Sequence, residues 1–90
     1  MASESKLQSK IQEHLRSKGY FVVNVVRASR GGVPDILCCL NGAFVAIEVK
    51  VGKNKESPLQ IYNAHQIRKA GGVAVVIRSM VELRAFLGEG

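Results

Sequence analysis

The hydrophobic and polar positions of the chain first follow a helical period and then a strand period. Leu7, Ile11 and Leu15 recur every four residues among polar neighbours, which predicts an amphipathic helix over about 5–17. The β-branched and aromatic residues that follow predict a strand over 20–26. The chain therefore begins with a helix that has one apolar face to bury, and a strand to bury it against.

The next two apolar runs have the pattern of a β-hairpin. They cover residues 33–40 and 43–50 and are joined by Asn41 and Gly42. Asn-Gly is the preferred pair for a two-residue type I′ turn, because both residues tolerate a positive φ. A second helix is predicted to about Lys69, followed by a strand over 73–77 and a short closing helix.

Each predicted helix begins with Ser and has Gln or Glu three residues later, which is the spacing of a capping box. The pairs are Ser5 with Gln8, Ser57 with Gln60, and Ser79 with Glu82. Pro58 follows the second capping Ser at the first helical position, where proline is favoured. The predicted order is α-β-β-β-α-β-α, an α/β fold with a mixed sheet flanked by helices, in one domain over 1–90.

Composition narrows the classes of function. The 90 residues carry 13 Lys+Arg against 7 Asp+Glu, a net charge of +6, which favours a polyanionic partner such as nucleic acid. No apolar run is long enough for a membrane helix, and there is no P-loop or dinucleotide motif for a nucleotide cofactor. Cys38 and Cys39 are adjacent and form no metal-binding spacing, so a reducing, cytoplasmic compartment is expected.

The hairpin also brings charged residues together. If Asn41 and Gly42 form the turn, Asp35 faces Glu48, and Lys50 lies on the same face of the sheet. Two facing carboxylates repel each other, so this arrangement calls for a neutralising group. A divalent cation such as Mg²⁺ or Mn²⁺ suits these oxygen ligands, and the alternative is an ion-pair network with Lys50.

These residues resemble the signature of the PD-(D/E)XK nuclease superfamily. Pro34-Asp35 is followed, after twelve intervening residues, by Glu48-Val49-Lys50. The elements Gly32-Val33-Pro34-Asp35 and Ser57-Pro58-Leu59-Gln60 are similar to the VRR-NUC branch of that superfamily, over essentially the whole chain. The resemblance implies a restriction endonuclease-like core and a metal-dependent phosphodiesterase.

The resemblance also implies a role for each site residue. Asp35, Glu48 and the Val49 carbonyl would hold Mg²⁺ or Mn²⁺, and Lys50 would position the attacking water and stabilise transition-state charge. Gln60 would orient the nucleophile or the phosphate, or act only as the capping partner of Ser57; the two roles are compatible.

The family also places a metal-binding acid on the first helix. Glu4, with Gln8 one turn later, matches that pattern, and Glu13 is the alternative.

Basic residues flank the predicted site on both sides along the chain. They suit contacts with the sugar–phosphate backbone rather than with base edges, because no base-reading motif is present. The candidates for DNA binding are Lys6, Lys10, Arg27, Arg30, Lys53 and Lys55.

The resemblance extends to small stand-alone domains of bacteriophages and bacteria, and to archaeal Holliday-junction resolvases. It implies a homodimeric endonuclease that makes paired incisions in four-way DNA junctions. Three alternatives remain open: a flap, single-strand or RNA nuclease of the same chemistry; a non-catalytic DNA-binding module; and a structural partner protein.

Overall fold

The computed structural model of the protein describes residues 3–89 and has the predicted order of elements. The helices are α1 (Glu4–Ser17), α2 (Pro58–Lys69) and α3 (Met80–Phe86). The strands are β1 (Phe21–Asn24), β2 (Ile36–Leu40), β3 (Ala43–Val49) and β4 (Val73–Ile77). Within these residues, no helix is long and apolar enough to cross a membrane.

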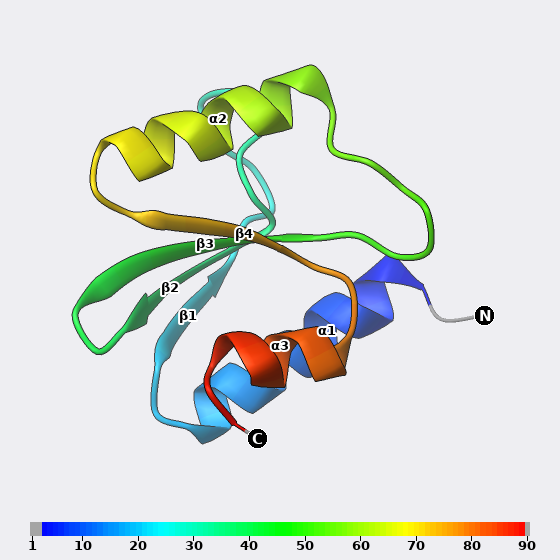
Figure 1. The fold of residues 1–90 in the computed structure, drawn as a ribbon, viewed down its shortest axis with the longest axis vertical. Coiled ribbons are helices and arrows are strands. Elements are labelled where there is room, and N and C mark those ends of the chain that lie inside the picture. Colours follow the sequence, from blue (N-terminus) through cyan, green and yellow to red (C-terminus); the bar gives the residue numbers. More distant parts are fainter. Residues whose placement is uncertain (1–2, 90) are drawn as a thin grey trace.

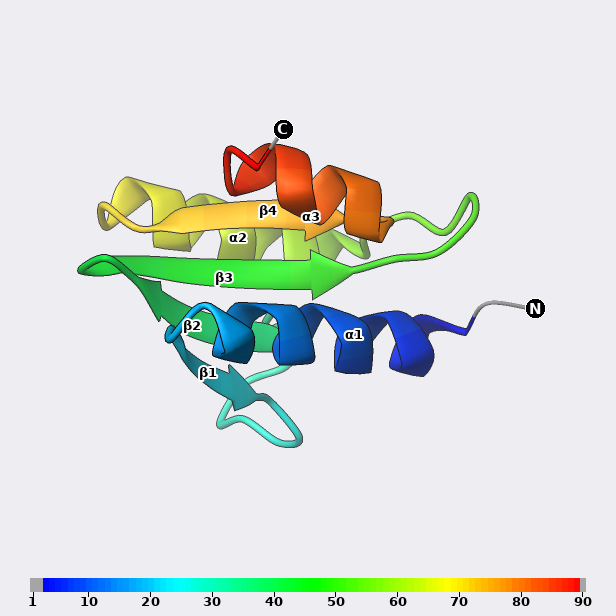
Figure 2. The same cartoon turned by 90° about the horizontal axis from the view of Figure 1, so that it is seen from below.

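The four strands form one mixed sheet in the order β1-β2-β3-β4 (Figures 1 and 2). β1, β2 and β3 are antiparallel neighbours, and β4 pairs in parallel with β3. The parallel pair requires a crossover connection, and α2 supplies it. The fold class predicted from the sequence, a mixed sheet flanked by helices, is therefore confirmed.

The predicted hairpin has the predicted register. Leu40 pairs with Ala43 and Ile36 pairs with Ile47, so the two loop residues are Asn41 and Gly42. Their φ angles are 50° and 87°, the positive values that a type I′ turn requires. The register then continues to Asp35 and Glu48, one residue beyond the last paired rung.

Helices cover the two faces of the sheet unequally (Figures 1 and 2). α1 and α3 pack on one face, where Ile11, Leu15, Ile47 and Leu83 are fully buried. α2 lies on the other face over Ala46 and two further alanines, Ala64 and Ala74. The small side chains let α2 approach β3 and β4 closely. On the same face Leu37 of β2 is partly buried against these alanines, whereas Phe21 and Val23 of β1 are exposed.

The first helix begins earlier than the sequence pattern indicates. Its N-cap is Ser3, whose hydroxyl accepts a hydrogen bond from the Lys6 amide at 3.1 Å. The predicted capping box of Ser5 and Gln8 is therefore wrong, and Ser5 lies inside the helix. Serines at positions 3 and 5 are equally suitable as caps by type, and the apolar period does not distinguish them.

Two strands are shorter than predicted. β1 ends at Asn24; the Val25 amide still donates to the Asp35 carbonyl at 2.8 Å, in the register of the β1–β2 pair, and the chain then enters a loop. β2 begins at Ile36, three residues later than expected. Pro34 has no amide hydrogen for the ladder, so the segment before Asp35 runs as a loop.

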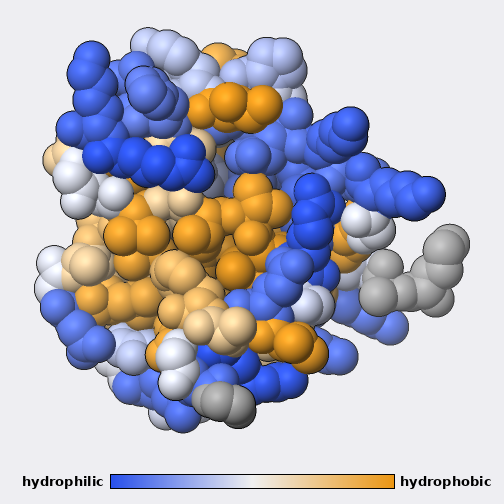
Figure 3. Space-filling view, viewed as in Figure 1, coloured by the Kyte–Doolittle hydropathy of each residue, from blue (hydrophilic) through white to orange (hydrophobic). Residues whose placement is uncertain are grey.

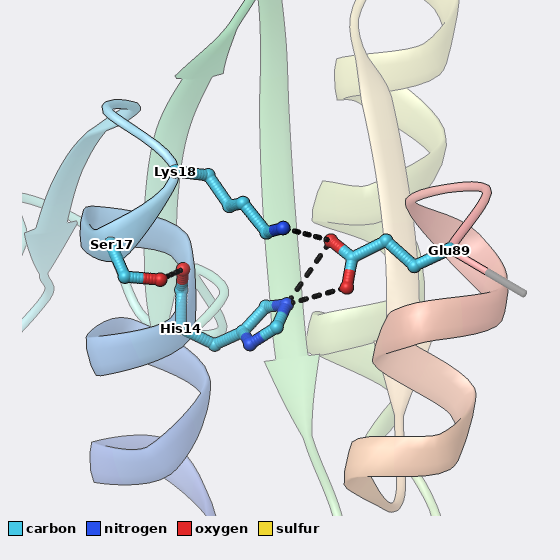
Figure 4. A network of polar contacts seen from close by, with 4 residues as sticks. All are labelled: His14, Ser17, Lys18 and Glu89. Atoms are coloured by element: carbon cyan, nitrogen blue, oxygen red, sulfur yellow. Dashed lines mark hydrogen bonds and ion pairs between the residues drawn. The ribbon is translucent and has the colours of Figure 1, made fainter.

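A polar network joins the end of the chain to α1 (Figure 4). The His14 imidazole donates from Nε2 to Glu89 Oε1 at 2.8 Å, and Lys18 Nζ lies 3.7 Å from Glu89 Oε2. The same carboxylate therefore contacts two groups near the C-terminal end of α1. This contact holds the segment after α3 against α1, on the sheet face opposite α2.

Candidate active site

The acidic and basic residues of the hairpin meet where β3 leaves the sheet. Ile47 and Val49 point into the core under α1, so Glu48 between them points to the face that carries α2. Asp35 immediately precedes β2, and Lys50 immediately follows β3. The strand alternation therefore places Asp35, Glu48 and Lys50 on one side of the sheet, beside the first turn of α2.

Glu48 is an acidic side chain inside the protein, with only 3% of its surface exposed. Its Oε2 atom lies 3.6 Å from Lys50 Nζ and accepts a hydrogen bond from Gln60 Nε2 at 3.2 Å. Its Oε1 atom is buried and has no hydrogen-bond partner among residues 3–89. A buried carboxylate oxygen without a partner carries an energetic penalty, so this atom is suited to receive a ligand.

Burial and the neighbouring acid both disfavour the charge on Glu48. The pKa of its carboxyl is raised from 4.5 to about 8, first by desolvation and then by the nearby charge of Asp35. The Lys50 ammonium lowers the same pKa without overcoming those effects. The predicted ion pair is therefore present, but it does not neutralise the two facing carboxyls.

Asp35 is held by the backbone of the opposite strand. Its Oδ2 atom accepts a hydrogen bond from the Val49 amide at 3.0 Å, and its carbonyl accepts from Val25. These two bonds connect Asp35 to β3 and to the end of β1. The Asp35 carboxyl is thus fixed beside Glu48 by main-chain contacts.

Gln60 combines the two roles considered from the sequence. Its Oε1 atom accepts from the Ser57 amide at 2.8 Å, and the Ser57 hydroxyl accepts from the Gln60 amide at 3.1 Å. This reciprocal pair is a complete capping box at the start of α2. The other end of the same amide donates to Glu48, so the cap also orients Gln60 toward the acidic pair.

Sequence reasoning missed the contact that positions the loop before Asp35. Asn63 is buried on α2 and donates from Nδ2 to the Gly31 carbonyl and to the Leu59 carbonyl, both at 2.9 Å. Gly32 has φ of 75°, and a Cβ there would lie 2.8 Å from Leu59 and Asn63. Only glycine fits this close approach of loop and helix, which brings Asp35 to the N-terminal end of α2.

Glu4 is the first residue of α1, and its role as a metal ligand stays a prediction. The apolar side of α1 packs on the sheet face opposite Glu48. Among residues 3–89, no three His, Cys, Asp or Glu side chains gather at a point where they could hold a metal. Gln8, its proposed support, and Glu13, the alternative acid, belong to the same helix.

A basic groove lies beside the acidic site. It has a volume of about 940 Å³ and is formed by α1, by the loop after β3 and by the segment between β4 and α3. Three predicted DNA-binding residues, Lys6, Lys10 and Lys53, line it together with Arg78. Arg78 was not predicted; it is separated from the others in sequence and joins them by donating to the Gly52 carbonyl at 3.2 Å.

The other predicted DNA-binding residues lie outside this groove. Arg27 and Arg30 are exposed on the loop between β1 and β2, which leads to Asp35. Lys55 is exposed on the loop before α2. The structure thus distributes the basic residues over three segments around the carboxyl pair.

Taken together, the site offers two adjacent carboxyls, an ammonium and an amide, with positive charge around them. Comparison with known proteins supplies the family. A sequence profile of the archaeal Holliday junction resolvase (Hjc) family matches residues 4–70. The chain belongs to the Hjc family. The matched part contains all four predicted catalytic residues and ends before β4.

Two solved structures support the same relationship. One, described as a VRR_NUC domain, is 26% identical and has a TM-score of 0.84, with 94% of each chain covered. The other, a VRR_NUC domain protein, is 16% identical and has a TM-score of 0.82, covering 99% of this chain and 88% of that one. A comparison with curated proteins finds no match. The predicted VRR-NUC resemblance and restriction endonuclease-like fold are therefore confirmed, and this Hjc-family chain is a nuclease domain.

Proposed function

We propose that this Hjc-family nuclease is a metal-dependent DNA endonuclease that cuts branched DNA, with four-way junctions as its substrate. The observation that carries the metal requirement is the buried Glu48 Oε1 atom. It has no hydrogen-bond partner in the described part of the chain and belongs to a carboxyl facing Asp35. Mg²⁺ and Mn²⁺ prefer such oxygen ligands. A cation would offset the repulsion between the two carboxyls and complete the contacts of Glu48.

Asp35, Glu48 and the Val49 carbonyl are the proposed metal ligands. When bound there, the metal would lower the pKa of a water molecule and offset charge on the phosphate. The protein contributes the position of its ligands, since the Val49 amide holds Asp35 and the Gln60 amide holds Glu48. Glu4, at the start of α1, is the further acidic ligand proposed from the first helix.

Lys50 and Gln60 are the proposed groups for positioning and charge stabilisation. The Lys50 ammonium lies 3.6 Å from Glu48 Oε2, on the side where the phosphate of the substrate would approach. A fixed positive charge at this point stabilises the extra negative charge of the transition state. Gln60 is held at one end by Ser57 and donates to Glu48 with the other, so it keeps that carboxylate oriented.

The basic residues are proposed to bind the sugar–phosphate backbone. Lys6, Lys10, Lys53 and Arg78 line one groove, whereas Arg27, Arg30 and Lys55 lie on loops nearer the carboxyls. Such contacts hold a duplex in place without reading its sequence. Structure-selective cutting then depends on the shape of the DNA that can contact both sets.

Paired incisions in a junction require two active sites with matching symmetry. We propose a homodimer, because a two-fold axis relates two equal sites in the way a four-way junction relates its strands. Family membership supports nuclease activity, and the choice of a junction rests on the Holliday junction resolvase activity for which the Hjc family is named.

The test compares cleavage of labelled four-way junction, flap, single-stranded and linear duplex DNA, and of RNA, each with and without Mn²⁺. The variant Lys50→Ala is assayed beside Lys69→Ala, which removes an exposed lysine at the far end of α2. We expect symmetric, Mn²⁺-dependent nicks in the junction, a loss of at least about a hundredfold for Lys50→Ala, and normal cutting by Lys69→Ala.

Other results distinguish the alternatives. Cutting of flap, single-stranded DNA or RNA in preference to the junction would keep the chemistry and reject the junction as substrate. Binding of DNA without cutting under any metal would support a non-catalytic binding module. Retained cutting by Lys50→Ala would remove Lys50 from the reaction.

A further inference from the structure

The solvent side of the first two turns of α2 is apolar. Leu59, Ile61 and Tyr62 are 50%, 54% and 55% exposed, and along the chain they flank Gln60, which donates to Glu48. We call these three residues the apolar ridge. Single exposed apolar side chains are ordinary on protein surfaces, whereas three within four positions beside an active site form a patch. The proposed roles of the catalytic residues do not account for this patch.

The apolar ridge is held in place by its helix and by the loop between β1 and β2. The capping box of Ser57 and Gln60 fixes the start of the helix. The loop packs closely on Leu59, because a Cβ at Gly31 would lie 3.1 Å from Leu59 Cδ2, and Asn63 donates to the Gly31 carbonyl. A surface that is already ordered loses less conformational entropy when it binds a partner.

Positive charge surrounds the apolar ridge. α2 contains no Asp or Glu, and Arg68 and Lys69 lie in its last turn. Arg30 is exposed on the loop that packs against the ridge, and Lys55 is exposed just before the helix. Glu56 is the nearest acid in sequence, and it is half-buried. A partner that fits this surface therefore combines apolar groups with negative charge.

DNA with unstacked bases has this combination. Base faces stack on aromatic side chains, while the phosphates beside them carry negative charge. A regular duplex hides its base faces inside the stack, and a branch point exposes them. We infer that the apolar ridge stacks on bases at the branch point of the DNA, with Tyr62 as the main contact. This inference rests on the proposed function for DNA as the substrate.

Such a contact distinguishes branched from linear DNA. Phosphates repeat along every arm, so contacts with them position the DNA without marking the branch point. Bases stacked on the ridge would lie beside the helical turn from which Gln60 contacts Glu48. Tyr62 is then a residue that determines which DNA structure is cut, and it takes no part in the bond cleavage itself.

The molecule has a second apolar surface that provides a control. Figure 3 shows apolar side chains gathered over β4, between α2 and α3. Val81 on α3 is 69% exposed, and α3 packs on the sheet face opposite α2. Val81→Ala therefore shortens a well-exposed apolar side chain on another part of the surface.

The first experiment measures binding of four-way junction, flap and linear duplex DNA by fluorescence anisotropy, with chelator present. The proteins are the wild type, Tyr62→Ala, Tyr62→Phe and Val81→Ala. Loss of a stacked base should weaken binding of branched DNA by Tyr62→Ala about 5- to 100-fold, and duplex binding should stay within about twofold of wild type. Tyr62→Phe keeps the ring and should bind like the wild type, as should Val81→Ala. Urea unfolding establishes that each variant is folded.

A fluorescent base at the branch point gives a second measurement. The fluorescence of 2-aminopurine is quenched when the base stacks on another ring. Junction DNA with 2-aminopurine at the branch point should therefore be dimmer in complexes with the wild type and Tyr62→Phe than with Tyr62→Ala. The same base placed inside one arm should give equal signals for all variants. This readout reports stacking and does not depend on total affinity.

Two results would overturn the inference. One is a Tyr62→Ala variant that keeps the wild-type ratio of branched to duplex binding and the wild-type 2-aminopurine signal. The other is normal DNA binding by Tyr62→Ala with altered sedimentation of the free protein, which would assign the ridge to contact with a second copy of the chain. Cleavage with Mn²⁺ is measured separately. A wild type that neither binds nor cuts DNA would reject the proposed function, whereas normal cutting with an unchanged ratio for Tyr62→Ala would reject the ridge alone.

Discussion

Glu48 shows how one backbone position controls the chemistry of the site. It lies in β3 between Ile47 and Val49, both of which are completely buried on one face of the sheet. The Glu48 side chain therefore points to the opposite face, where it too is shielded from water. Gln60 and Lys50 both contact Oε2, whereas Oε1 has no hydrogen-bond partner within residues 3–89. The apolar neighbours thus make the carboxyl unfavourable as an anion and receptive to a cation.

The raised pKa predicts a pH dependence of stability for the metal-free protein. Between pH 4.5 and about 8, folded Glu48 retains a proton that the unfolded chain releases. Stability therefore falls as pH rises through this window, by up to about 1.4 kcal/mol per pH unit from this group. Urea titrations at pH 5.5 and pH 8.5, with chelator present, measure the difference in the free energy of unfolding.

Glu48→Gln should flatten this part of the profile, and Glu13→Gln is the control for removing one carboxyl from the exposed surface of α1. Mg²⁺ should stabilise the wild type most at pH 8.5, where the carboxyl is ready to bind it. A wild-type profile that rises with pH across this window would contradict the assigned state of Glu48.

Asp35 can be tested by two substitutions that separate its charge from its hydrogen bond. Asp35→Asn keeps an oxygen for the Val49 amide and removes the repulsion with Glu48. At pH 8.5, where Glu48 is ionised, the metal-free protein should therefore be more stable by about 1 kcal/mol. Asp35→Ala loses the bond as well and should be less stable by about 1 kcal/mol. Both variants should lose Mg²⁺ binding, measured by calorimetry. An Asp35→Asn variant less stable than the wild type would contradict the proposed repulsion between Asp35 and Glu48.

At the scale of elements, the start of α2 links helix formation to the site. Ser57 and Gln60 form the capping box, and only Gln60 continues to Glu48. Asn63, one turn further along, holds the loop that ends at Asp35. The first two turns of this helix therefore position both acidic residues.

Ser57→Ala and Gln60→Ala distinguish capping from function. Each removes part of the cap and should lower stability by about 1 kcal/mol in urea unfolding. Ser57→Ala should cut DNA nearly as well as wild type, because Glu48 keeps its amide partner. Gln60→Ala should lose at least about tenfold in cleavage rate; equal rates for the two variants would leave Gln60 with a capping role alone.

Helix starts also show where local reasoning succeeds and fails. The cap of α2 was predicted because Ser57, Pro58 and Gln60 are three agreeing signals in four residues. The cap of α1 was misplaced by two residues, since Ser3 and Ser5 both offer a hydroxyl that can cap a helix.

On the scale of the whole molecule, the basic groove depends on three segments that are distant in sequence. Lys10 comes from α1, Lys53 from the loop after β3, and Arg78 from the end of β4. These three positively charged side chains repel one another unless an anion lies between them. The groove therefore extends the binding surface away from the carboxyls, toward the side of the sheet that carries α1 and α3.

The groove makes a prediction about salt. Lys10→Gln should lower the slope of log K against log salt by about one unit, the effect of one phosphate contact. Arg78→Gln should do the same and also release the Gly52 carbonyl that it binds. Lys69→Gln is the matched control on α2. Fluorescence anisotropy at several salt concentrations gives the slopes; equal slopes for all three variants would exclude the groove from DNA contact.

Short-range patterns in the chain were enough to predict the order of elements, the hairpin register and the meeting of Asp35, Glu48 and Lys50. These features depend on periodicity and on a two-residue turn, which act over a few residues. The role of Glu4 stays a prediction from the resemblance, because α1 can be recognised locally but the sheet face on which it packs cannot.

Long-range packing decided the remaining features. The burial of Glu48, the contact of Asn63 with the loop, the entry of Arg78 into the groove and the uncovered Phe21 arise where segments far apart in sequence meet. Periodicity specifies which side of an element is apolar, whereas the position of α2 over the sheet specifies which apolar residues stay exposed. The chemistry of the site was therefore readable along the chain, and its environment and surroundings required the folded molecule.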